Sequence, residues 1–402
     1  MNTIKIQSID GRQLQVSRSR ISTTSFVLRC MIERYSNVGD ITFHLPYTFE
    51  SLHVISELLE SKASRLSSLK TAMDILKINK KLRIFGINQF CYSHIAAMLR
   101  TEDVCCVHDM ASKISNYKLL YTCWRMFDAK CDQIFCTDVY LNCKEATIDT
   151  LVSRPINKYL DEKSIFDIAY RWAANKVNEK KSVRQLMEPF LPKIRFLTME
   201  NEIFESDDFL LVLTEKELEA IRLFFVTENL SCVPDNISKS IKTRTSYEYP
   251  SLFTYCNRYP PVIQIQRFMT KNIRFISEIF LHENCFMTKI RLPMTHSNRR
   301  GIKADLYFSI NGRKWRERNS LTCKKNGCIE LKVGFYIQKF TTFRIIIRFS
   351  KMDIIPINNI EIKPSADRFT STHDVIAIPP NKGNAYLNPK IFLIYCDVTL
   401  YF

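Results

Sequence analysis

The sequence predicts a multidomain α+β protein, and three observations along its 402 residues support this class. Residues 1–89 alternate short strand patterns with amphipathic helix patterns. Residues 90–233 carry helix patterns only, because their apolar residues recur every three or four positions. Residues 260–402 change to short runs of alternating apolar and polar residues, which are typical of an antiparallel β-sandwich. We therefore expect three domains, with residues 234–259 as a linker.

Composition places the chain among ordinary globular proteins. Hydrophobic residues make up 46% of the chain and charged residues 25%, which is usual for a globular protein. We expect no transmembrane segment, because no apolar run reaches about 18 residues, and the N-terminus lacks an apolar signal core. Apart from the adjacent pair Cys105-Cys106, the 14 cysteines are scattered singly, which favours buried thiols over a disulfide framework. Cytoplasmic or nuclear localisation follows as an expectation.

Glycine is scarce, with 8 residues in all and none between Gly86 and Gly301. Phosphate-binding loops and strained nucleophile turns both depend on glycine. The sequence therefore disfavours nucleotide-binding and hydrolase folds, and we expect no catalytic residue and no cofactor.

Positive charge is concentrated in the rear of the chain. Residues 1–234 carry a net charge of +2, whereas residues 235–402 carry +15, out of a total of +17. The change coincides with Val233-Pro234, so we place a domain boundary there. An evenly charged front and a basic rear predict different partners for the two parts.

The first 89 residues follow a strand–hairpin–helix–strand–helix order. Residues 4–8 and 13–16 alternate as strands around the turn residues Asp10-Gly11. Residues 22–25 offer capping hydroxyls for a helix whose apolar face is predicted at Phe26, Val27, Cys30 and Met31. Residues 41–46 form the third predicted strand, and two further helix patterns follow it.

This order resembles the BTB/POZ fold. Residues 4–11, "Ile-Lys-Ile-Gln-Ser-x-Asp-Gly", are similar to the short POZ proteins of the elongin C and Skp type. Residues 16–25 match the BTB signature at Ile21 and Ser25, although Ser17 stands where the family usually has histidine. Dimeric BTB domains carry an extra helix before the first strand, and here the strand pattern starts at residue 4. Homodimerisation is therefore left open.

Met31-Ile32-Glu33 resembles the hydrophobic-x-Glu motif with which BTB adaptors bind a cullin. The resemblance implies that Met31 fills an apolar pocket of the cullin and that Glu33 accepts a hydrogen bond at its rim. The alternative interpretation makes Met31 a core residue and Glu33 a solvated charge at the end of a helix.

Two motifs in the helical middle resemble the BACK domain that follows BTB/POZ in ubiquitin-ligase adaptors. In residues 161–172 an apolar stripe recurs at helical spacing, and Glu162, Phe166 and Trp172 match the family's most recognisable helix. Residues 192–200 resemble a second BACK phrase, whose matching residues are Arg195, Phe196, Met199 and Glu200. Most of these residues are expected to be core residues first.

Close cysteines raise the question of a structural zinc site. Cys105-Cys106 lies near His108, but adjacent cysteines do not easily chelate one ion, and the other pairs fall in different predicted domains. We therefore expect free thiols and no metal.

The rear of the chain resembles discoidin-type jelly rolls. Residues 307–315 predict a hairpin that turns at Asn311-Gly312 and ends on Trp315. Residues 341–345 are similar to a later strand of the same family. The related PHR-type sandwich is the alternative.

Basic residues in the predicted loops of this domain could bind an anionic ligand. The candidate ligand-binding residues are Arg299, Arg300, Arg316 and Arg318. The alternative interpretation is a solvated basic surface without a ligand. Binding of nucleic acid is disfavoured because Trp315 is the only nearby aromatic residue available for stacking.

The resemblances together imply a substrate-recognition adaptor of a cullin–RING ubiquitin ligase. The POZ-like front and the BACK helices would bind the cullin, and the β-sandwich would select an unknown protein substrate. The alternative is a scaffold outside any ligase, or a basic protein that binds anionic ligands through its β domain alone.

Overall fold

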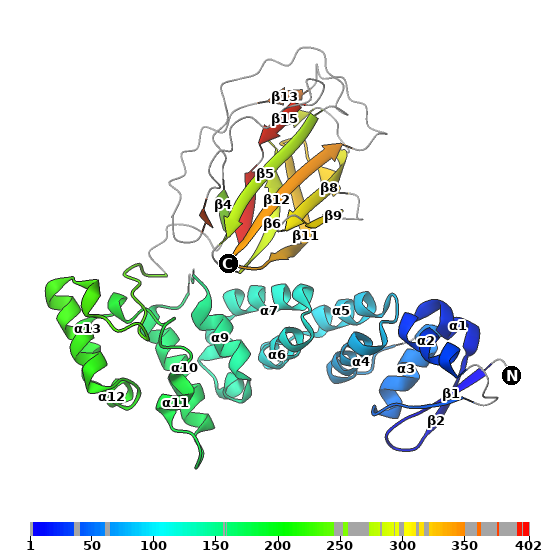
Figure 1. The fold of residues 1–402 in the computed structure, drawn as a ribbon, viewed down its shortest axis with the longest axis horizontal. Coiled ribbons are helices and arrows are strands. Elements are labelled where there is room, and N and C mark those ends of the chain that lie inside the picture. Colours follow the sequence, from blue (N-terminus) through cyan, green and yellow to red (C-terminus); the bar gives the residue numbers. More distant parts are fainter. Residues whose placement is uncertain are drawn as a thin grey trace. The chain divides into compact units, whose positions relative to one another are not determined.

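The computed structural model divides the chain into two compact units, residues 1–147 and residues 148–402. It describes residues 3–35, 41–60, 65–155, 157, 159–244, 252–255, 273–281, 284–292, 294–296, 301–310, 313–316, 321–349, 360–362, 376–377, 392–395 and 397–401. Helices dominate the front half, and small, mainly antiparallel sheets make up the rear. The chain is therefore an α+β protein, as predicted (Figure 1).

A three-stranded sheet opens the first unit. Its strands are β1 (Thr3–Gln7), β2 (Gln13–Ser17) and β3 (Thr42–His44), in the order β2-β1-β3. The hairpin between β1 and β2 turns at Gly11, whose φ of 79° lies in the left-handed region that favours glycine. β3 pairs with β1 in parallel. The three predicted strands and the turn are confirmed.

Ser25 separates two consecutive helices, α1 (Arg18–Thr24) and α2 (Phe26–Arg34). Its backbone is extended and forms an antiparallel bridge with Ile84. Its hydroxyl donates to Leu82 O at 2.6 Å and accepts from Leu28 N at 3.1 Å. The cap at Ser25 is confirmed. The other predicted capping residues, 22–24, lie inside α1, because the helix continues until the bridge between Ser25 and Ile84 interrupts it.

The remaining helices of the first unit carry the apolar stripes that the sequence predicts. They are α3 (Phe49–Leu59), α4 (Leu69–Leu82), α5 (Ile87–Met98), α6 (Val104–Ile114), α7 (Tyr117–Ala129) and α8 (Cys131–Phe135), followed by η1 (Asp138–Asn142) and α9 (Glu145–Ser153), which crosses into the second unit. Trp124 and Phe127 of α7 are buried, as expected. The apolar face of α2 is the exception. Leu28 and Ile32 are its buried residues, and Phe26 and Cys30 are exposed.

The second unit begins with helices around α10 (Glu162–Lys176). The others are α11 (Val183–Met187), η2 (Phe196–Thr198), η3 (Asn201–Glu205), α12 (Asp207–Val212), α13 (Glu215–Thr227) and η4 (Leu230–Cys232). Asp161 caps α10 by accepting from Ser164 N at 2.8 Å. Trp172 is buried against Phe190, with ring centroids 5.8 Å apart. The predicted stripe of α10 is thus confirmed as core.

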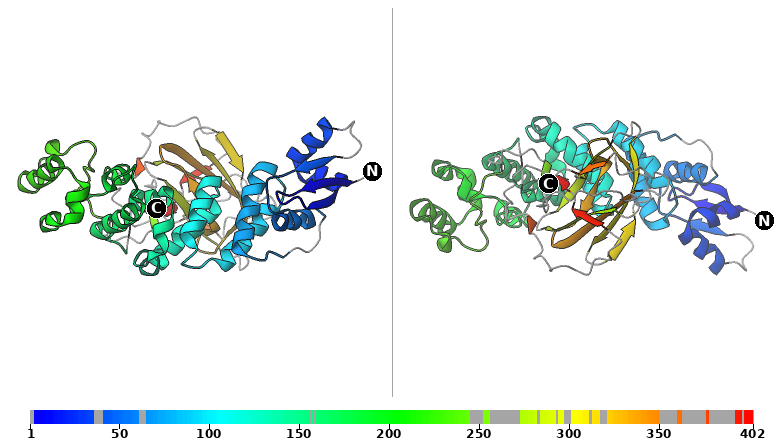
Figure 2. Two further views of the ribbon diagram at one scale, coloured as in Figure 1. Left: turned by 90° about the horizontal axis from the view of Figure 1, so that it is seen from below. Right: turned by 90° about the horizontal axis from the view of Figure 1, so that it is seen from above.

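Strands dominate the described residues from Leu252 onward, as Figures 1 and 2 show. The larger sheet runs β10 (Leu321–Cys323), β8 (Ile302–Ile310), β12 (Thr341–Phe349), β5 (Ile273–Leu281), β14 (Ile376–Ala377), with β9 (Arg313–Arg316) beside β8 and β15 (Phe392–Tyr395) beside β5. A second sheet runs β11 (Cys328–Ile337), β6 (Cys285–Arg291), β16 (Asp397–Tyr401), β4 (Leu252–Tyr255), and β7 (Met294–His296) pairs with β13 (Ile360–Ile362).

Alternate residues of both larger sheets contribute to one buried cluster. Ile345 and Ile347 enter it from β12, and Ile290 and Ile329 enter it from the second sheet.

β8 and β9 pair with Ile310 opposite Arg313, on either side of the predicted turn residues, so the hairpin pairing is confirmed. The expectation of purely antiparallel pairing is wrong in one place, because β15 pairs with β5 in parallel. The strand predicted over residues 262–265 lies outside the described residues.

Candidate protein-interaction surfaces

Met31 and Glu33 lie in the last turn of α2. Successive residues are separated by about 100° around a helix axis, so these two side chains leave α2 on opposite flanks. Met31 is half-buried and Glu33 is exposed beside Arg29, 3.8 Å away. A partner that contacts both residues therefore has to reach around the end of α2.

The exposed face of α2 carries apolar residues as well. Phe26 is 61% exposed and lies under the guanidinium of Arg29. In the bridge between Ser25 and Ile84, the side chains of these two residues are buried, and the side chains of the residues on either side of them point outward. Phe85, which is 91% exposed, is one of these flanking residues and donates its N–H to Thr24 O. The first unit thus displays two aromatic rings beside the end of α4.

The structure brings together the two BACK-like motifs of the helical middle. Glu162 begins α10, and its carboxylate accepts a hydrogen bond of 2.8 Å from Arg195 N. The rings of Phe166 and Phe196 meet edge to face with centroids 6.1 Å apart. Phe196 is buried, whereas Glu200 is exposed. Most of the motif residues therefore position the helices and do not form a contact surface.

A buried arginine that no sequence motif singled out completes this arrangement. Arg244 lies in the segment predicted as a linker, yet its guanidinium is buried against the carboxylate of Glu162, with Nε 2.8 Å from Oε2. The same guanidinium donates to the carbonyl oxygens of Val152, Arg154 and Lys193. Arg195 donates to Lys242 O from the other side. Residues 242–244 are therefore fastened to the helices around α10.

A second carboxylate, that of Glu217, binds the start of the segment that was predicted as a linker. The carboxylate of Glu217 in α13 accepts hydrogen bonds of 2.8 Å from both terminal nitrogens of Arg184. It also accepts a hydrogen bond from the side-chain amide of Asn236. Burial alone would raise the pKa of Glu217, but the hydrogen bonds from Arg184, Thr214 N–H and Asn236 outweigh burial and lower that pKa below its ordinary value. The ionised carboxylate is the form that holds these three elements together.

Replacing Glu217 with glutamine should reduce the pH dependence of stability. Because the folded pKa of Glu217 is depressed, its stabilising contribution is complete above the unfolded value of about 4.3 and is lost as pH falls below it. Denaturant unfolding at neutral and acidic pH should therefore show a gap between parent and Glu217→Gln that is widest at neutral pH and closes in acid. A gap of equal size at both pH values would contradict this origin.

The cysteines offer no metal centre in the part of the chain that the structure describes. Cys105 is buried in α6 while its neighbour Cys106 is exposed, so the two thiols leave the helix in different directions. Burial raises the pKa of Cys105, and likewise that of Cys91, to about 12. Such thiols are inert at neutral pH. Within the described residues, no group of three His, Cys, Asp or Glu side chains could hold a metal ion.

A protein-family model agrees with the helical motifs. The BACK domain, described as BTB And C-terminal Kelch, matches residues 104–222. No curated protein matches the chain.

The BACK match runs from the first residue of α6 into α13 and includes both motifs. It confirms the BACK prediction and supports the wider resemblance to BTB/BACK proteins, which work through protein–protein interaction. None of the helices in the described residues is long and apolar enough to span a membrane.

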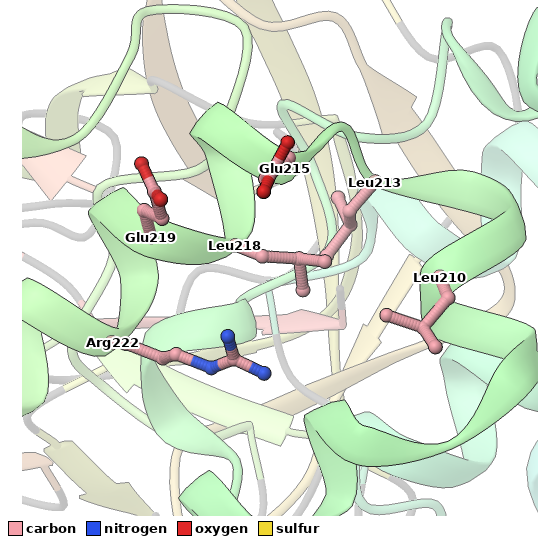
Figure 3. Close-up of a pocket in the computed structure, with 6 residues that line it drawn as sticks. All are labelled: Leu210, Leu213, Glu215, Leu218, Glu219 and Arg222. Atoms are coloured by element: carbon pink, nitrogen blue, oxygen red, sulfur yellow. The ribbon is translucent and has the colours of Figure 1, made fainter.

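The α12–α13 region contains a pocket that the sequence motifs did not indicate. Three leucines and three charged residues line it, namely Leu210, Leu213, Leu218, Glu215, Glu219 and Arg222. Figure 3 shows the leucines directed toward a common space, with the two carboxylates on successive turns of α13. A surface of this kind fits apolar groups that carry positive charge nearby.

Most residues of the predicted anionic-ligand patch are not among the residues that the structure describes. Arg299, Arg300 and Arg318 lie outside the described residues. Arg316 is the last residue of β9, opposite Tyr307 of β8. Whether the four arginines lie together stays a prediction.

Proposed function

We propose that this protein is a substrate-recognition adaptor of a cullin–RING ubiquitin ligase. The observation that carries the proposal is the BACK match over residues 104–222, which follows a small β-sheet with helices of the expected POZ order. In this proposal residues 1–89 form a POZ domain that binds the cullin. The adaptor has no catalytic residue and acts in the cytoplasm or nucleus by holding a substrate near the ligase.

The rear of the chain is proposed to select the substrate as a discoidin-like β-sandwich. The support is the single buried cluster to which both larger sheets contribute alternate residues. Recognition would use the basic loops, including Arg299, Arg300, Arg316 and Arg318. An acidic substrate surface complements the net charge of +15 over residues 235–402.

Replacing Met31 and Glu33 with alanine tests the cullin contact. The double variant should bind a purified cullin N-terminal domain more weakly by about 2 kcal/mol or more, because one buried anchor and its rim hydrogen bond are lost. Since the two side chains leave opposite flanks of α2, each single variant should also weaken binding if the cullin reaches around the helix end. Calorimetry measures these affinities.

Met98→Ala and Glu102→Ala form the matched control, because both side chains are exposed in the same unit away from α2. This control should bind the cullin as the parent does. Equal cullin affinity for the parent and the Met31/Glu33 variant would overturn the contact. Absence of any cullin binding by the parent would favour the alternative, a scaffold outside the ligase.

A further inference from the structure

Residues 200–228 form an acidic region in a strongly basic chain. They contain nine acidic residues and two basic ones, although the whole protein has a net charge of +17. One of the two bases, Arg222, is already paired with Glu205 at 2.7 Å. No ion pair joins Glu215 or Glu219 to another residue within the described ranges. The region thus presents negative charge that is available to a partner.

The same region also displays apolar side chains to solvent. Within the described residues, five of the exposed large hydrophobic residues fall between positions 210 and 230, namely Leu210, Leu211, Leu223, Val226 and Leu230. Val226 is 83% exposed and Leu211 is 59% exposed. Exposed apolar residues that gather in one region, in contrast to singly scattered ones, are a mark of interaction sites.

Helical geometry places the charge and the apolar groups on one face. α13 buries Leu218, Ile221 and Phe224 against the rest of the unit. Glu215, Glu219 and Val226 lie on the opposite side, since residues three or four apart are neighbours on a helix surface. The leucine-lined pocket opens beside Glu215 and Glu219 (Figure 3). The acidic apolar face consists of this side of α13 together with the exposed leucines of α12.

We infer that the acidic apolar face binds a basic amphipathic helical segment of a partner protein. The apolar residues of such a segment would enter the leucine-lined pocket and cover Val226, and its lysines or arginines would pair with Glu215 and Glu219. Apolar anchors supply affinity, and the complementary charge steers association and fixes register. The inference deepens the proposed adaptor function by naming the chemistry of one partner, and it requires no cullin.

Other occupants fit the surface less well. Nucleic acid and anionic membranes are repelled by the excess of carboxylates. The basic rear of a second copy has the right charge, but among its residues from Leu252 onward whose exposure is described Phe340, between β11 and β12, is the only exposed large hydrophobic residue, so that described part offers few apolar anchors. A separate basic segment with its own apolar stripe satisfies both requirements.

Binding of a synthetic peptide to the full-length protein tests the inference. The probe is a fluorescein-labelled leucine–lysine amphipathic peptide of about four helical turns. Its affinity, measured by fluorescence anisotropy, should fall at least about tenfold in Glu215→Lys/Glu219→Lys and should weaken as salt rises. Leu211→Ser/Val226→Ser should produce a comparable loss, since it removes apolar contacts at exposed positions where folding is spared.

Matched controls separate this site from the general charge of the chain. Glu179→Lys/Glu188→Lys makes the same change in net charge at exposed positions elsewhere, and Phe340→Ser removes an exposed apolar residue elsewhere. Both controls should bind the peptide as the parent does.

Three results would overturn the inference. The first is that the parent does not bind the peptide, and the second is that the site variants bind it as tightly as the parent does. The third is that the protein self-associates in a concentration-dependent way and that Leu211→Ser/Val226→Ser abolishes this association. The last result would assign the face to a second copy. Cullin affinity is measured separately, so its retention alongside a failed peptide test would leave the proposed adaptor function standing.

Discussion

Replacing Arg244 with methionine should lower the free energy of unfolding by about 3–5 kcal/mol, one of the largest effects expected for a single substitution in this chain. The guanidinium and the carboxylate of Glu162 are both almost fully buried, with side-chain exposures of 2% and 4%. Removing the arginine leaves the buried carboxylate of Glu162 without the positive charge that pairs with it. It also removes the hydrogen-bond donor of three backbone carbonyl oxygens. Denaturant unfolding followed by far-ultraviolet circular dichroism measures the loss.

Two companion variants distinguish a buried pair from an ordinary surface contact. Lys239→Met breaks an ion pair with Asp235 in the same segment, but both groups are solvent-exposed, so its cost should stay below about 1 kcal/mol. Adding Glu162→Leu to Arg244→Met should recover part of the loss, because the stranded charge is then removed. A small effect of Arg244→Met alone, similar to that of Lys239→Met, would show that residues 242–244 are not anchored to the helices.

The sequence predicted the features whose cause is local, such as amphipathic helices and tight turns. The apolar stripe of α10 follows directly from residues three and four apart, and the structure buries Ile165, Phe166 and Trp172 as that spacing requires. The hairpin at Gly11 follows from a turn that needs a left-handed backbone. In each case the physical cause lies within a few residues, so the pattern was visible without the fold.

Features that depend on distant partners were not predicted. Arg244 and Glu162 are 82 positions apart, and no local pattern connects an arginine in an apparent linker with a carboxylate at a helix start. Ser25 ends α1 because it bridges to Ile84, so the extra helix was missed for the same reason. The buried face of α2 was misjudged because Phe26 and Leu28 are both apolar, and only the neighbouring helices decide which of them is covered.

Trp172 is a residue of the helical middle whose contacts make truncation costly. It lies on the buried face of α10 with 4% of its surface exposed. Its ring meets Phe190 edge to face at 5.8 Å, an arrangement that favours aromatic pairs beyond the area they bury. Because protein interiors are closely packed, neighbouring groups cannot fully collapse into the space that a missing indole leaves.

Trp172→Ala should therefore lower the free energy of unfolding by about 3–5 kcal/mol, the sum of lost apolar burial and the cavity left behind. Trp172→Phe should cost less, because it keeps an aromatic ring near Phe190. Val226→Ala on the exposed face of α13 should change stability by no more than about 0.5 kcal/mol. Denaturant midpoints of the three variants provide the comparison. An unchanged midpoint for Trp172→Ala would show that the indole is not packed in the core, and it would place the BACK-like stripe of α10 in the wrong register.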